Sequence, residues 1–313
     1  LAEDGRGPLA ISSIAFGSAV GVVFVRRQLT LDDPMIDLSL FRVRAFNASL
    51  ATNVLGIFIA FGYFLFVAQY LQLVLGLSPL EAGLWSLPSA LGFIVGSQAA
   101  PWILRRVRPA YVIGVGLAMA SVGLAMLTGV EGTDDLTLVI TASVIASLGL
   151  APVFTATTEL IVGSAPLEQA GAASGISETG SELGGALGIA ILGSIGAAVY
   201  RSELADLLPT GVPAEAAAAA RDTLGGAVGA ADELPGQLGS SLVEAAQDAF
   251  IQGMRVSSAI ATIVAIAVAV LAVSMLRHVR SGADREADAE SEAAAERDIA
   301  SDVVVAEAVP AEC

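Results

Sequence analysis

The stretch AGAASGISETGSELGGALGIAILGSIGAAVY, residues 170–200, decides the fold class, because it is a long apolar segment with only two charged side chains, Glu178 and Glu182. A helix of about 20 predominantly apolar residues is long enough to cross the hydrocarbon core of a bilayer. The stretch exceeds that length, so it predicts a transmembrane helix. We therefore expect an integral membrane protein.

The composition of the whole chain supports this class. Of the 313 residues, 55% are hydrophobic and 15% are charged, and the mean hydropathy is +0.75. The net charge of −16 comes mostly from two polar segments: residues 201–250 hold eight acids against two arginines, and residues 281–313 hold ten acids against two arginines. We therefore expect the acidity to belong to solvated appendages of an all-α membrane body.

Seven apolar segments are long enough to be transmembrane helices. Arginines flank the links after the first and third segments and follow the last one. An excess of arginine in alternate short loops marks the cytoplasmic side. The pattern predicts a multi-pass protein of the plasma membrane with a cytoplasmic C-terminus. The predicted segments are residues 8–25, 47–75, 82–104, 110–130, 136–162, 170–200 and 256–276.

The same pattern divides the chain into five parts. An odd number of spans, in a chain that starts at Leu1 rather than Met, predicts the C-terminal half of a longer transporter, whose N-terminal bundle would be a partner. The five parts are an extra helix with its cytoplasmic connector (1–46), five helices of a bundle (47–200), an acidic extracellular loop with short helical stretches (201–250), the last spanning helix (251–280) and an acidic cytoplasmic tail predicted to be disordered (281–313).

Glu178 and Glu182 are the candidate functional residues, and they lie four residues apart on one helix face. A helix that enters near Ala170 places Glu182 about 18 Å along its axis, close to the middle of a ~30 Å core. Charges at that depth cost about 2.5–3.5 kcal/mol on insertion scales, so such residues usually face a wet cavity and serve protons, ions or cationic substrates. Burial and a neighbouring carboxylate both favour protonation, so we expect the pair to exchange a proton near neutral pH. The alternative is an interfacial pair in a helix that starts near Ser177.

Two further patterns concern packing and binding. Gly180, Gly184 and Gly188 are spaced by four, which predicts either close packing against another helix or a smooth surface along which helices slide. The aromatic stretch FGYFLFVAQYLQ, residues 61–72, offers a large π surface for a flat or cationic ligand, with lipid-facing rings as the alternative. The residues of this stretch that we expect to line a cavity are Phe64, Gln69 and Tyr70.

No enzyme motif is present in the sequence. It contains neither a P-loop nor a nucleophile elbow, and its single cysteine and single histidine cannot form a Cys/His cluster. We therefore expect no enzymatic activity, no cofactor, no metal site and no nucleic-acid partner.

Three stretches resemble one known family. PMIDLSLFRVRAFNAS (34–49) resembles the connector that opens the C-terminal half of fourteen-span drug:proton antiporters of the major facilitator superfamily. FVAQYLQLVLGLSPLEAGLWSLP (66–88) resembles the helix–turn–helix that follows, and AGAASGISETGSELGGALGIAILG (170–193) resembles the penultimate span. This branch of the family includes quaternary-ammonium and multidrug resistance exporters.

The resemblance implies a role for each part of the chain. Residues 8–25 would be an extra central helix, and the next six helices would form the C-terminal bundle. Glu178 and Glu182 would bind cationic substrate or protons. GSQAAPWILRRVR (96–108) resembles a cytoplasmic gating loop, with arginines at the positions Arg105, Arg106 and Arg108.

The function expected from these observations is proton-coupled export of amphipathic or cationic organic compounds such as drugs, which would confer antibiotic resistance. The partners would be the lipid bilayer, a small-molecule substrate and protons. Two alternatives remain open. One is an exporter of a neutral or anionic metabolite or lipid, and the other is a helical membrane scaffold that transports nothing.

Overall fold

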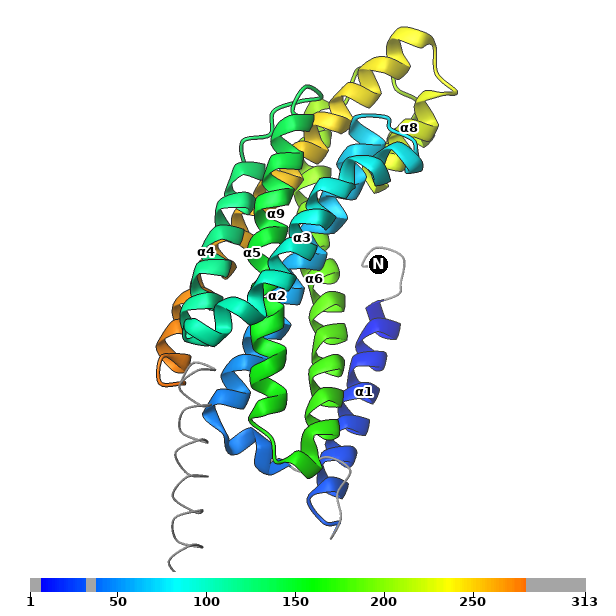
Figure 1. Cartoon of the computed structure of the whole chain (residues 1–313). Helices are drawn as coiled ribbons and strands as arrows, with labels where there is room; N and C mark the ends of the chain where they lie inside the picture. The colour runs from blue at the N-terminus through cyan, green and yellow to red at the C-terminus, as the bar shows by residue number, and fades with distance from the viewer. Residues whose placement is uncertain (1–6, 32–37, 280–313) are drawn as a thin grey trace, which may run out of the picture.

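The computed structural model describes residues 7–31 and 38–279, and this part of the chain is built of helices without strands. The predicted tail, 281–313, lies outside the described residues. The helices are α1 (Gly7–Gln28), α2 (Arg44–Gln69), α3 (Pro79–Arg106), α4 (Pro109–Leu127), α5 (Leu136–Gly163), α6 (Ala170–Leu207), α7 (Ala214–Asp222), α8 (Leu224–Ala231) and α9 (Gly236–Leu276), with short turns of other helix types at Leu38–Arg42, Tyr70–Val74 and Leu167–Gln169. The long helices form an elongated bundle, and α7 and α8 lie at one end of it (Figure 1).

Six helices of the described part are long and apolar enough to span a membrane: α2 with its π-helical extension, α3, α4, α5, α6 and α9. The predicted count of seven is therefore not exact. The seventh prediction, residues 8–25, falls on α1, which is helical but is not among the six. Residues 15–27 of α1 are exposed, and none of the other described helices packs extensively against it. The six helices after α1 share a core that α1 does not enter.

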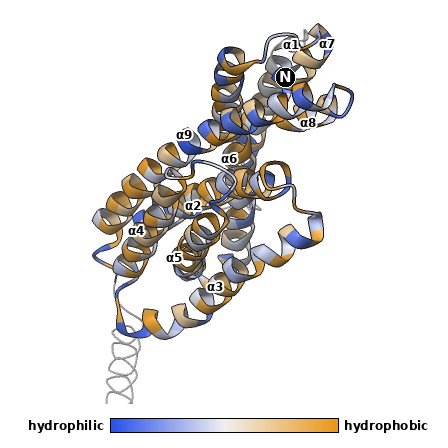
Figure 2. Cartoon of the chain, turned by 90° about the horizontal axis from the view of Figure 1, so that it is seen from above, coloured by the Kyte–Doolittle hydropathy of each residue, from blue (hydrophilic) through white to orange (hydrophobic). Residues whose placement is uncertain are grey.

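The six spanning helices pack around α2, α5 and α9. Helix α5 contacts α3 and α4 along its length, and α2 contacts α6, α9 and α5. Helix α9 also packs against α4 and α6 and so closes the bundle on that side. Seen from above, hydrophobic residues predominate on the spanning helices, and hydrophilic residues lie mostly toward their ends (Figure 2).

Glycines permit the closest of these helix contacts. A Cβ on Gly116 of α4 would meet the carbonyl oxygen of Gly149 of α5 at 2.6 Å, and a Cβ on Gly149 would meet the carbonyl oxygen of Gly116 at 2.5 Å. A larger side chain at either position would separate the two helices. Small residues at helix contacts are typical of membrane bundles, where packing rather than the hydrophobic effect drives association.

The predicted glycine stripe lies along the contact between α6 and α2. Gly184 lies against the backbone carbonyl of Val54, and Gly188 lies against the backbone carbonyl of Phe58. Gly180 faces the side chain of Val54, whose Cγ2 would be 3.0 Å from an added Cβ. The two helices therefore meet backbone to backbone at Gly184 and Gly188.

The start of α3 follows from its sequence. Gly76 adopts a positive φ of 66°, which turns the chain after the π-helical segment. Ser78 then caps α3, because its hydroxyl accepts a hydrogen bond from the Glu81 amide at 3.3 Å and the Glu81 carboxylate accepts one from the Ser78 amide at 2.9 Å. This reciprocal capping box explains why the helix begins at Pro79.

The segment 201–250 is largely helical in the structure. It holds the end of α6, then α7 and α8, and the first part of α9. Helix α9 begins at Gly236, earlier than the predicted span at 256–276, because residues such as Leu242 and Ala246 are buried where α8 and α2 pack against it. The Gln247 Nε2 atom donates hydrogen bonds to the two carbonyls that end the π-helical turn, at 3.2 and 3.0 Å.

Candidate functional site

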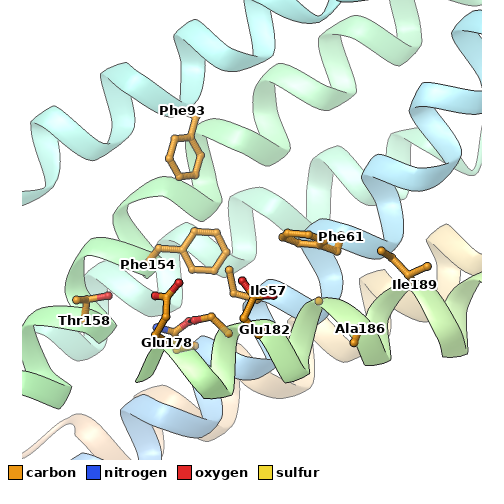
Figure 3. A pocket seen from close by; sticks show the side chains of 12 residues that line it. Ile57, Phe61, Phe93, Phe154, Thr158, Glu178, Glu182, Ala186 and Ile189 are labelled. Carbon is orange, nitrogen blue, oxygen red and sulfur yellow. The ribbon is translucent and has the colours of Figure 1, made fainter. Parts of the chain in front are cut away.

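A cavity of about 580 Å³ lies between α2, α3, α5 and α6. Glu178 and Glu182 both line it from α6, one helical turn apart. Figure 3 shows the two carboxylates rising from α6 toward the side of the cavity that carries Phe154 and Ile57. Two helix pairs from separate parts of the chain, α2–α3 and α5–α6, therefore surround the two predicted acids with one cavity.

The position of the two acids within α6 differs from the helix start near Ser177 that one alternative from the sequence supposed. The helix begins at Ala170, so Glu178 and Glu182 lie eight and twelve residues beyond its first residue. At 1.5 Å per residue they are about 12 and 18 Å along the axis. The helix does not start near Ser177, and the pair does not cap it.

The cavity is acidic and opens onto the surface of the bundle. Among the described residues, its lining contains no basic side chain, and both glutamate side chains are exposed. Their uncharged polar neighbours in the lining are Asn53, Thr158 and Ser181. Two carboxylates without a basic partner in a membrane helix are suited to hold protons or a cationic group.

Three phenylalanines form much of the apolar part of the cavity wall. Phe93 of α3 and Phe154 of α5 have ring centroids 6.2 Å apart with a 40° angle between the rings. Phe61 of α2 lies against the backbone of Gly185, where an added Cβ would meet its ring at 3.2 Å. Sequence reasoning did not single out Phe93 or Phe154, because an isolated phenylalanine in an apolar span looks the same whether it faces lipid or a cavity.

The three residues of the aromatic stretch that we expected in the cavity do not line it. Phe64 is exposed and stacks on Tyr63 with a centroid distance of 4.6 Å. Tyr70 is fully buried, and its hydroxyl donates a hydrogen bond to the Gly132 carbonyl at 2.6 Å. Gln69 is the last residue of α2. The reason is geometric: Gln69 and Tyr70 lie about two turns beyond Phe61, and Phe64 is rotated by about 60° from it around the helix axis.

The three arginines of the predicted gating loop lie at the other end of α3 from its capped start. Arg105 and Arg106 end the helix, and Arg108 precedes α4. The Arg106 guanidinium stacks over the Trp102 ring at 4.5 Å, and the Arg108 Nη1 atom donates a hydrogen bond to the Arg277 carbonyl at 3.4 Å. All three arginines are exposed and stand apart from the cavity.

Asn53 joins α2 to α6 beside the glutamates. Its Nδ2 atom donates a hydrogen bond to Ser177 Oγ at 3.5 Å, and its Oδ1 atom accepts one from Ser181 Oγ at 3.3 Å. The sequence marks Asn53 only as one of several uncharged polar residues in the spans. Its pairing with two serines more than 120 residues away requires the fold.

A bundle of six helices that are long and apolar enough to span a membrane, with an acidic, aromatic-walled cavity between four of them, is typical of membrane transporters. Residues 8–189 match the family model of the Major Facilitator Superfamily, and the chain belongs to this family. The superfamily predicted from the sequence is thereby confirmed, as is a multi-pass membrane protein.

Three relatives of this chain have names that describe efflux of drugs or resistance to them. The chain is 37% identical over 268 residues to the multidrug efflux pump LfrA of Mycolicibacterium smegmatis. The aligned region covers 86% of this chain and 53% of the relative. It is 34% identical over 271 residues to the tetracenomycin C resistance and export protein of Streptomyces glaucescens, covering 85% and 49%. It is 35% identical over 257 residues to the methyl viologen resistance protein SmvA of Salmonella typhimurium, covering 79% and 50%.

The chain spans about half the length of these curated relatives. The same proportion holds for a solved structure with the same fold, a bacterial homologue of the human lysosomal transporter Spinster in an inward-facing, unoccupied conformation. That likeness has a TM-score of 0.59 at 19% identity, and it covers 77% of this chain and 51% of the other.

Proposed function

We propose that this chain is one half of a secondary exporter that expels amphipathic, cationic organic compounds in exchange for protons. The observation that carries the proposal is the pair Glu178 and Glu182 in a cavity walled by Phe61, Phe93 and Phe154. A cavity of about 580 Å³ is also within the usual size range of small-molecule sites. The names of the relatives, among them a multidrug efflux pump and a methyl viologen resistance protein, support this substrate class.

The chemistry of the site supports exchange of a cation for protons. A carboxylate in a membrane cavity needs either a proton or a neighbouring positive charge, because an uncompensated charge is costly there. A cationic substrate supplies that charge, and the ring faces of the phenylalanines attract the same cation. Protons and substrate therefore compete for Glu178 and Glu182, so binding of one releases the other.

The proposal includes a second six-helix bundle, which would close the open side of the cavity. The relatives are about twice as long as the matched region, which leaves room for such a bundle, and the exposed Glu178 and Glu182 lie where it would pack. By the resemblance in sequence, we place the chain in the C-terminal half of a fourteen-span exporter of the quaternary-ammonium branch, with α1 as an extra helix.

The proposed orientation places the arginine-rich end in the cytoplasm. Arg105, Arg106 and Arg108 then form a cytoplasmic gating loop, and the end of α9 at Arg277 brings the C-terminus to the same side. Excess arginine on short cytoplasmic loops is the general rule for bacterial membrane proteins. Substrate would then reach the glutamates from the cytoplasmic half of the membrane.

An export assay tests the proposal. The full chain is expressed in a pump-deficient bacterial host together with the half of the mycobacterial relative that it does not match, and efflux of methyl viologen is followed with and without a proton gradient. We expect efflux that stops when the gradient is collapsed. Efflux of a neutral dye without any cation efflux would favour a metabolite or lipid exporter, and no flux of either would favour a scaffold.

Phe61 and Phe64 provide a matched pair for testing the cavity wall. They lie three residues apart on α2 and have nearly equal exposure, 48% and 49%, but Phe61 lines the cavity and Phe64 does not. We expect Phe61→Leu to weaken binding of an aromatic cation such as ethidium about five- to tenfold, because it removes a cation–π contact of ~1 kcal/mol or more. Titration calorimetry on the purified chain measures both variants, and Phe64→Leu is expected to bind as the wild type does. A loss that is equal in the two variants, or larger for Phe64→Leu, would contradict the assignment of this wall.

A further inference from the structure

At Gly184 and Gly188 the contact between α6 and α2 offers little side-chain resistance to rotation or sliding, whereas farther along the same contact Leu192 of α6 packs against Gly62 of α2. Gly184 and Gly188 lie against the backbone carbonyls of Val54 and Phe58, so no side chain of α6 projects between the helices at these points. Interdigitating side chains are what usually set the rotation and axial position of packed helices. Around Gly184 and Gly188, a directed polar contact can therefore help to set the rotation and axial position of α6.

Asn53 supplies two directed contacts across this interface. Its side chain is 4% exposed, and its amide donates to Ser177 Oγ and accepts from Ser181 Oγ. One side chain on α2 therefore holds two residues that are one turn apart on α6. Both bonds are lengthened or broken when α6 turns or slides. A single buried asparagine sets the register of coiled coils in the same way.

The two serines are the immediate neighbours of the two acids in sequence. Ser177 precedes Glu178, and Ser181 precedes Glu182. Adjacent residues on an α-helix are separated by about 100° around its axis. When both serines face α2, both glutamates point about 100° away from α2 around the axis of α6. In this orientation they line the cavity.

We infer that Asn53 is a positioning residue, which fixes the rotation of α6 through Ser177 and Ser181 so that Glu178 and Glu182 face the cavity together. This inference rests on the proposed function of the two glutamates. The pair supplies the titratable groups in the described cavity lining. Charged residues on the neighbouring elements toward the same end of the bundle stand outside that lining, and they are Arg44, Arg105, Arg106, Glu159, Glu168 and Arg277.

The test is methyl viologen binding to the full purified chain, measured by titration calorimetry at about pH 8 and at about pH 5, the second of which is closer to the ordinary pKa of a carboxyl group. Asn53→Ala removes the two bonds from the α2 side. The double variant Ser177→Ala/Ser181→Ala removes them from the α6 side with almost no change in volume. Thr52→Val is the matched control, because Thr52 is equally buried but bonds only to the Ala48 carbonyl of its own helix.

We expect the wild type to bind the dication more tightly at the higher pH, where protons compete less. Asn53→Ala and the serine double variant are expected to bind about tenfold more weakly at the higher pH and to lose most of this pH dependence. The reason is that α6 can then turn so that its two carboxylates no longer face the same ligand. Thr52→Val is expected to keep the affinity and the pH profile of the wild type.

The possible outcomes separate this inference from the proposed function. Wild-type affinity and pH profile in Asn53→Ala would overturn the inference and leave the proposed function intact. If Asn53→Ala does not fold, the serine double variant decides, and a wild-type profile there overturns the inference. If the wild type itself binds no methyl viologen, or binds it equally at both pH values, the proposed function fails and the inference fails with it.

Discussion

Replacement of both Glu178 and Glu182 by glutamine is expected to reduce methyl viologen binding about a hundredfold and to abolish its export. Coulomb attraction between two unit charges about 4 Å apart is roughly 1 kcal/mol in bulk water and roughly 4 kcal/mol at an effective dielectric constant of about 20, and the double variant removes both carboxylate charges from one cavity. Glutamine has nearly the same size as glutamate, and the two residues line an open cavity rather than a packed core, so we expect the bundle to fold. Calorimetric binding and whole-cell efflux measure the two effects.

The single variants and a control on the same helix sharpen this prediction. Glu178→Gln and Glu182→Gln are each expected to lose part of the affinity for a dication and less of the affinity for a monocation. The control is Glu203→Gln/Asp206→Asn, which removes two acids from the far end of α6, outside the cavity. If this control reduced binding as much as the cavity pair does, net charge rather than the site would be responsible.

Replacement of Gly188 by leucine is expected to give the largest loss of stability among substitutions on α6. A Cβ at this position would collide with the backbone carbonyl of Phe58, and a backbone atom cannot move aside as a flexible side chain can. Overpacking in a close contact costs about 1–3 kcal/mol and sometimes more. Thermal unfolding of the purified chain, followed by circular dichroism, should give a clearly lower midpoint.

Gly175 provides the control for the glycine substitution. It lies on the same helix, and nothing is within 4 Å of the place where its Cβ would stand. Gly175→Leu is expected to unfold at the wild-type midpoint or slightly above it, because leucine favours a helix more than glycine does. Equal destabilisation by the two variants would mean that loss of glycine, rather than the α2–α6 contact, is the cause.

The spanning helices could be predicted from the sequence because hydrophobic length is a one-dimensional property. Residues 47–75, 82–104 and 136–162 fall within or nearly on the helices found there. The start of α9 was harder to predict, since residues 236–255 mix polar and apolar side chains and are helical because they pack against α8 and α2. The position of α1 relative to the bundle could not be predicted, because an apolar run does not indicate which helices it contacts.

The two acids of the site could also be predicted, because a carboxylate in an apolar span is rare enough to need a reason. The residues of the cavity wall could not be predicted from the sequence. Phe93 and Phe154 come from helices that meet α6 only in the fold, and the choice of Phe64, Gln69 and Tyr70 over Phe61 shows that composition identifies a stretch but not the face of it that points inward. The role of Asn53 could not be predicted either, because it depends on hydrogen bonds to two serines on another helix.

The most direct measurement is the number of protons released when the purified chain binds methyl viologen, obtained from calorimetry in buffers of different ionisation enthalpy. If Glu178 and Glu182 hold either a proton or the cation, the wild type releases protons as the dication binds, and Glu178→Gln/Glu182→Gln releases none. Binding without proton release in the wild type, or the same release in the double variant, would contradict the exchange of proton for substrate at this pair.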